Sequence, residues 1–151
     1  MNGQCNIKYK GTIVEAICLL YTVLFVYAGS SKLLGLGDFK AQLAQTGVLA
    51  PFAGWVAWFV PLVEILLAIL LLTKAFRLAA LYGALVLMAL FTTYIAWMLR
   101  FSEHIPCSCG GVISSMGWKS HLVFNACWMV LALIGIVLME NKKSNFKNTV
   151  Q

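Results

Sequence analysis

The chain has very little charge for its length. Only 11% of its 151 residues are charged and 62% are apolar, whereas a soluble domain is about 25% charged and about 45–50% apolar. So few polar residues exclude a soluble globule and a disordered chain. The eleven Lys and Arg give a net charge of +6 but occur in ones and twos, without a basic face, which excludes a nucleic-acid-binding module. The composition is that of a small integral membrane protein.

Four apolar stretches are long enough to cross a bilayer, which takes roughly 20 helical residues. We expect transmembrane helices at 13–34, 53–73, 78–99 and 121–139. Glu64 interrupts the second stretch at a cost of about 2.5–3.5 kcal/mol, which about a dozen apolar residues offset at roughly −0.3 to −0.6 kcal/mol each. The first stretch has some features of a cleavable signal peptide, but it is long for one and contains Glu15, so we expect a retained helix.

Short connections between these stretches predict an all-α, integral membrane four-helix up-down bundle. We expect a single membrane domain over 1–151, with a tight turn at 73–76 and a polar cytoplasmic tail at 140–151. The small residues at 28–31 predict close helix packing. The sequence shows no internal repeat or linker, and the absence of an inverted repeat disfavours a transporter.

The first connection contains a short helical pattern. We expect Asp38 to cap a helix at 39–46 that ends at Gly47. Phe39 and Leu43 are one turn apart, so they share a face that we expect to lie on the bilayer surface.

The positions of Lys and Arg predict the orientation of the bundle. Seven of them fall in the N-terminal segment, the second connection and the C-terminal tail, and four fall in the first and third connections. The side richer in Lys and Arg faces the cytoplasm. Both termini are therefore expected in the cytoplasm, with the third connection outside.

That third connection carries the sharpest local motif, Pro-Cys-Ser-Cys-Gly-Gly at 106–111. In an extended or turn conformation the Cα atoms of Cys107 and Cys109 come about 5.5–7 Å apart, at the edge of disulfide range. The ring they close is strained and therefore easily reduced, which indicates a redox-active dithiol. A static disulfide is one alternative. A Zn or Cu site formed by His104, Cys107, Cys109 and His121 is another.

Several polar residues interrupt the apolar stretches. Glu64 falls near the bilayer midplane, where an ionisable group indicates a functional site, and Lys32 is its expected cationic partner. His121 and Asn125 are one turn apart on one face, and Tyr94 adds a hydroxyl in the outer half of the third span. These groups are candidates for proton transfer in a redox step. A structural Lys–Glu clamp and packing by polar contacts are the alternatives.

The order of these motifs resembles that of the MauE/DoxX family of redox-associated membrane proteins, and of its methylamine-utilisation members in particular. The similarity covers residues 12–139. The motifs that carry it are Tyr27-Ala28-Gly29-Ser30-Ser31-Lys32-Leu33, Pro61-Leu62-Val63-Glu64, Pro106-Cys107-Ser108-Cys109-Gly110-Gly111, and His121 with Asn125.

The resemblance implies a four-helix bundle in the bacterial inner membrane. Members of this family are associated with maturation of the disulfide-rich small subunit of methylamine dehydrogenase, alongside a thioredoxin-like partner. DoxX-like relatives are linked to thiol oxidation, in some cases with a quinone. By this resemblance Cys107 and Cys109 are the thiol-exchange pair, and Lys32, Glu64 and His121 are family-like polar positions.

Two functions remain in competition. The first is a membrane component of a thiol–disulfide redox system, with a periplasmic Cys107–Cys109 pair that exchanges electrons with a thioredoxin-like protein or a client. In that function His121 and Glu64 assist the catalytic cysteines, and Glu64, Lys32, Tyr94 and Asn125 hold a quinone or relay protons. The second is a non-enzymatic assembly factor or small subunit of a larger membrane complex, with the cysteines as a structural disulfide.

Overall fold

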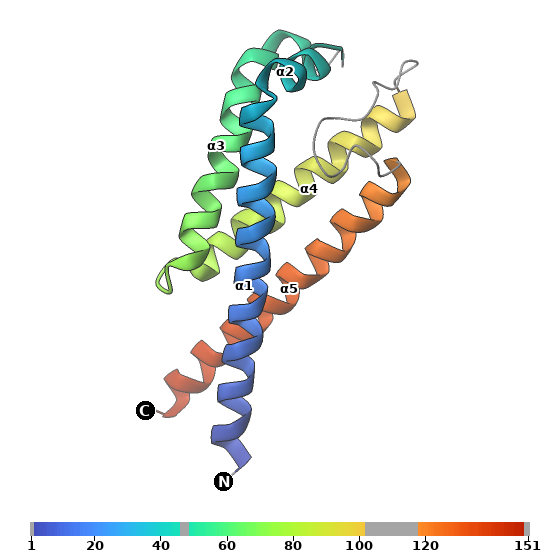
Figure 1. The fold of residues 1–151 in the computed structure, drawn as a ribbon. Coiled ribbons are helices and arrows are strands. Elements are labelled where there is room, and N and C mark those ends of the chain that lie inside the picture. Colours follow the sequence, from blue (N-terminus) through green and yellow to red (C-terminus); the bar gives the residue numbers. More distant parts are fainter. Residues whose placement is uncertain (1, 46–48, 102–117, 150–151) are drawn as a thin grey trace.

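The chain folds into helices joined by short turns. A computed structural model describes residues 2–45, 49–101 and 118–149 (Figure 1). The described elements, in chain order, are α1 (Asn2–Leu34), α2 (Leu36–Gln45), the 3-10 helix η1 (Ala50–Phe52), α3 (Ala53–Leu72), α4 (Arg77–Phe101) and α5 (Trp118–Thr149). The described residues contain no strand, so the all-α fold class is confirmed.

The four long helices alternate in direction. The N- and C-termini and the turn at 73–76 lie at one end of the bundle, hereafter the terminal end, and α2 lies at the opposite end, the α2 end (Figure 1). Helix α1 packs mainly along α3, and α4 mainly along α5. All four are long and apolar enough to cross a membrane, at Lys10–Leu34, Ala50–Leu72, Arg77–Arg100 and Ser120–Asn141. The up-down membrane bundle is confirmed.

The core forms where α1 meets the other three long helices. Tyr21 and Phe25 on α1 are fully buried, together with Leu71 and Leu81 from α3 and α4. The Tyr21 hydroxyl donates a hydrogen bond to the backbone carbonyl of Trp128 on α5, and the two rings meet edge to face with centroids 4.8 Å apart. The buried hydroxyl thereby has a hydrogen-bond partner within the apolar bundle. The bond links α1 to α5.

Glycine allows the closest approach between α1 and α3. A Cβ atom added at Gly29 would stand 3.1 Å from the Ile65 side chain and 3.2 Å from the Pro61 carbonyl oxygen. Even an alanine here would require these neighbours to shift by a few tenths of an ångström. The packing role expected of the small residues at 28–31 is therefore present at Gly29.

Helix α2 differs from its expected form. It begins at Leu36, so Asp38 lies in its first turn and is not its N-cap. Leu43 is only 4% exposed and packs with Ala53 and Ala57 of α3, so the prediction that it lies on the bilayer surface is wrong. The small side chains at the start of α3 leave room for Leu43, and burial against protein removes its apolar surface from water as well as lipid does.

The first and last helices of the chain are longer than the apolar stretches predict. Helix α5 continues to Thr149, although residues 140–151 were expected to form only a polar tail, and α1 begins at Asn2. Hydrophobic periodicity does not detect these extensions because they are polar. A helix that is already nucleated adds one backbone hydrogen bond for each residue it fixes, so α1 and α5 can continue into polar sequence.

Candidate functional site

A buried ion pair joins α1 to α3. The Lys32 ammonium donates a hydrogen bond of 2.7 Å to Oε1 of Glu64. The Glu64 side chain is 1% exposed and that of Lys32 is 21% exposed. The pairing expected from the sequence is therefore present. Charges with so little access to water are costly to hold in a membrane unless they are paired.

The direction of helical side chains explains how Lys32, near the end of α1, reaches Glu64, in the middle of α3. In an α-helix each Cα–Cβ bond tilts toward the N-terminus. Lys32 therefore points back into the bundle, and its ammonium lies 3.5 Å from the carbonyl oxygen of Ala28, one turn earlier. Helix α3 runs the opposite way, so Glu64 points toward the α2 end. The two side chains converge from opposite directions.

Helix α4 also reaches this pair. The Lys32 ammonium lies over the ring of Phe91 on α4, 5.4 Å from its centroid, which is within cation–π range. His121 is half-buried at the start of α5. Lys32 thus contacts residues of both α3 and α4. Nothing in the sequence pattern singles out Phe91, because an aromatic residue on an apolar helix is ordinary core material.

Two buried polar atoms on α3 and α5 lack a partner. Oε2 of Glu64 accepts no hydrogen bond, and Nδ2 of Asn125 donates none. Asn125 is 3% exposed and lies on α5, one turn after His121. A buried polar group without a partner costs free energy, so each of these atoms is a candidate contact for a polar ligand.

Tyr94 lies on α4. It packs against the small cluster of Leu43, Ala53 and Ala57 at the α2 end. Of the metal ligands considered above, His104, Cys107 and Cys109 lie outside the described residues. Within the described parts of the chain, no group of three or more His, Cys, Asp or Glu side chains is placed to hold a metal ion.

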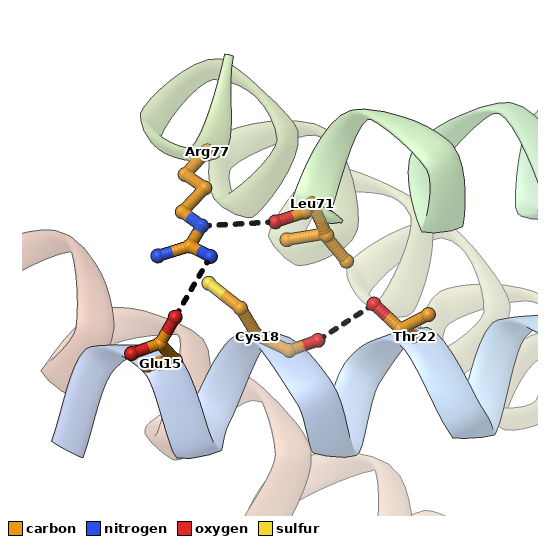
Figure 2. A network of polar contacts seen from close by, with 5 residues as sticks. All are labelled: Glu15, Cys18, Thr22, Leu71 and Arg77. Carbon is orange, nitrogen blue, oxygen red and sulfur yellow. Dashed lines mark hydrogen bonds and ion pairs between the residues drawn. The ribbon is translucent and has the colours of Figure 1, made fainter. Parts of the chain in front are cut away.

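A second ion pair lies at the terminal end. Figure 2 shows Arg77, the first residue of α4, extended between α1 and the last turn of α3. Its Nη2 atom lies 3.3 Å from Oε1 of Glu15, and its Nε donates a 3.1 Å hydrogen bond to the carbonyl oxygen of Leu71. Cys18 is buried beside this network. This pair was not predicted from the sequence, although a charged residue such as Glu15 inside an apolar stretch indicates that a partner exists.

Comparison with known protein families identifies the chain. Residues 10–138 match the family described as methylamine utilisation protein MauE. Searches of the curated proteins and of the solved structures find no match. The matched region contains the first three membrane spans and all but the last three residues of the fourth, with the Lys32–Glu64 pair and both candidate redox cysteines. The chain belongs to the MauE family.

Proposed function

We propose that this protein is the membrane component of a thiol–disulfide redox system that matures methylamine dehydrogenase. Cys107 and Cys109 exchange electrons with a thioredoxin-like partner or a disulfide-containing client on the outer side of the bacterial inner membrane. Membership of the MauE family supports a role in methylamine utilisation. The Lys32–Glu64 pair is the observation that favours a redox role over a purely structural one.

The location of that pair supports the proposal. Helix α4 ends at Phe101 and α5 begins at Trp118, both at the α2 end of the bundle (Figure 1). These two helix ends flank the segment that carries Cys107 and Cys109. Lys32 and His121 lie near the same end. Ionisable groups thus extend from the middle of the bundle toward the end at which α4 ends and α5 begins.

Closure of a dithiol to a disulfide releases two electrons and two protons. A quinone bound in the bundle would take up both and become a quinol. The unpaired polar atoms are of the kind that such a group needs. Lys32 and the free Nδ2 of Asn125 are donors for a carbonyl oxygen, and the free Oε2 of Glu64 is an acceptor for a hydroxyl. Lys32 and Asn125 would orient the head group, and the Glu64 carboxylate would accept a hydrogen bond from its hydroxyl.

The test is thiol trapping in intact cells. The variant Cys5→Ser/Cys18→Ala/Cys127→Ala retains only Cys107 and Cys109, and an impermeant maleimide is added with and without prior reduction. We expect two labels by mass after reduction and none before it. A reduction potential of about −120 to −200 mV would match an exchange catalyst, and one below about −300 mV would indicate a static disulfide. Labelling only after lysis would contradict the orientation.

The variant Cys107→Ser/Cys109→Ser separates the two candidate functions. If it abolishes maturation of the dehydrogenase while the membrane level of the protein is unchanged, thiol exchange is required. If maturation continues, the protein is an assembly factor or a structural subunit and the redox proposal is wrong. Cys18→Ala is a suitable matched control, because Cys18 is 2% exposed and packed in the core, out of reach of a soluble partner.

A further inference from the structure

The two ends of the bundle differ strongly in charge. The terminal end carries seven cations and two carboxylates, a net charge of +5, and the other end carries four cations and three carboxylates, a net charge of +1. The cations of the terminal end are Lys8, Lys10, Lys74, Arg77, Lys142, Lys143 and Lys147. This end therefore contains nearly all of the excess positive charge of the molecule.

The fold gathers these charges into one region. The start of α1, the turn between α3 and α4, and the end of α5 all lie at the terminal end (Figure 1). Helix α1 extends eight residues before the apolar span that begins at Lys10, and α5 extends eight residues after the span that ends at Asn141. At 1.5 Å per residue each extension is about 12 Å long, so it passes through a lipid head-group layer of about 5–8 Å.

The carboxylates of this end do not balance the lysines. Glu15 pairs with Arg77 across 3.3 Å. Oε1 of Glu140 accepts a 2.8 Å hydrogen bond from the hydroxyl of Tyr82 on α4. Both acidic groups are thus held against the bundle by contacts within the chain. Lys74, in contrast, is exposed in the turn beside the apolar and equally exposed Phe76, an arrangement typical of a segment at the membrane surface.

We infer that the terminal end is a binding surface for anionic phospholipid head groups. Lys8, Lys10, Lys142 and Lys143 lie within two residues of the ends of the apolar spans of α1 and α5. Positive charge at that depth is complementary to lipid phosphates. Each Lys or Arg near an anionic membrane surface strengthens binding by about fivefold, which corresponds to about 1 kcal/mol. The surface selects anionic over zwitterionic lipid and fixes the depth of α1 and α5 in the bilayer. This inference is independent of the redox proposal.

The experiment measures lipid binding to the purified full chain. The protein in a neutral detergent is titrated with phosphatidylglycerol, with phosphatidylcholine of the same acyl chains, and with glycerol phosphate, and bound molecules are counted by native mass spectrometry. We expect phosphatidylglycerol to bind at least about tenfold more tightly than phosphatidylcholine. That preference should fall toward unity in high salt, because salt screens exposed charges.

Two triple variants locate the surface. Lys142→Gln/Lys143→Gln/Lys147→Gln should lower the preference for phosphatidylglycerol by about tenfold or more. Lys40→Gln/Arg100→Gln/Lys119→Gln removes the same charge from the α2 end and should leave the preference unchanged. Circular dichroism checks that both variants remain helical. Equal binding of the two lipids to the unmodified chain, or equal losses in the two variants, would overturn the inference. Glycerol phosphate binding as tightly as phosphatidylglycerol would also overturn it, because the site would then recognise a soluble phosphate.

Discussion

The burial of the Lys32–Glu64 pair predicts that the two single substitutions destabilise the protein to different extents. Replacing Lys32 with Met leaves the Glu64 carboxylate, 1% exposed, without a cation. Breaking a buried ion pair on one side costs about 3–5 kcal/mol, because an uncompensated charge stays behind. Glu64→Met should cost less, because the Lys32 side chain is 21% exposed and long enough to turn its ammonium toward the membrane surface. Lys32→Met should therefore lower the free energy of unfolding by more than Glu64→Met does.

The double variant Lys32→Met/Glu64→Met tests whether the loss of stability comes from the unpaired charge. Two apolar side chains of similar size replace the two charges, so no charge is left unpaired, and such replacements are often neutral or stabilising by about 1–4 kcal/mol. We expect the double variant to be more stable than either single variant. The assay is reversible unfolding in mixed micelles with added dodecyl sulfate, followed by circular dichroism. A double variant that loses the sum of the two single losses would refute the argument, because the two side chains would then not interact.

The same double variant separates a clamp from a functional site. If the pair only holds α1 against α3, a stable double variant keeps its activity in maturation of the dehydrogenase. If the pair handles protons or orients a ligand, activity is lost while stability is kept. A purely structural role cannot produce the second result.

Five further variants test the helix packing, the second ion pair and the Tyr21 hydrogen bond, each by the same unfolding assay. Gly29→Val should cost about 1–3 kcal/mol through overpacking, whereas Gly37→Ala, where an added Cβ meets nothing within 4 Å, should stabilise by about 0.5–1 kcal/mol. Arg77→Met should cost more than Glu15→Gln, because the Arg77 side chain is 16% exposed and bonds two groups, whereas Glu15 is 53% exposed, and exposed pairs contribute about 0–1 kcal/mol. Tyr21→Phe should cost about 0.6 kcal/mol, the typical value for an interhelical hydrogen bond in a membrane, and an unchanged stability would show that the bond to α5 is absent.

Most of the fold could be predicted from the sequence because a bilayer imposes a strong constraint. A membrane segment must satisfy its backbone internally and remain apolar for roughly 20 residues. The turn at 73–76 and the four spans follow from that requirement. The expected pairing of Lys32 with Glu64 already places α1 beside α3. The packing of α4 along α5 does not follow from the sequence, because these two spans carry no such pair of opposite charges. The close approach of α3 at Gly29 is likewise shown only by the structure.

The candidate site was partly predictable for a similar reason. A carboxylate in the middle of an apolar stretch needs a cation, and Lys32 was the expected one. The same rule applied to Glu15 would have predicted its pairing with Arg77. Phe91 and the burial of Leu43 could not be predicted, since an apolar side chain can face either lipid or protein without a change in sequence pattern. The roles of Cys107 and Cys109 remain predictions that the proposed trapping experiment tests.

The close approach at Gly29 and the ion pair form one geometric unit. Gly29 lies one turn before Lys32, and Pro61 lies one turn before Glu64, so the contact between Gly29 and Pro61 sets the separation at which the two charged side chains meet. A larger residue at Gly29 must push α3 away from α1, since the nearest atoms stand 3.1–3.2 Å from the added Cβ. The 2.7 Å hydrogen bond then lengthens or breaks. We therefore expect the coupling free energy between Lys32 and Glu64, measured by the double-variant cycle, to fall by at least about half in a Gly29→Val background. An unchanged coupling would mean that the lysine side chain follows Glu64 without help from the helix contact, and the two motifs would then act separately.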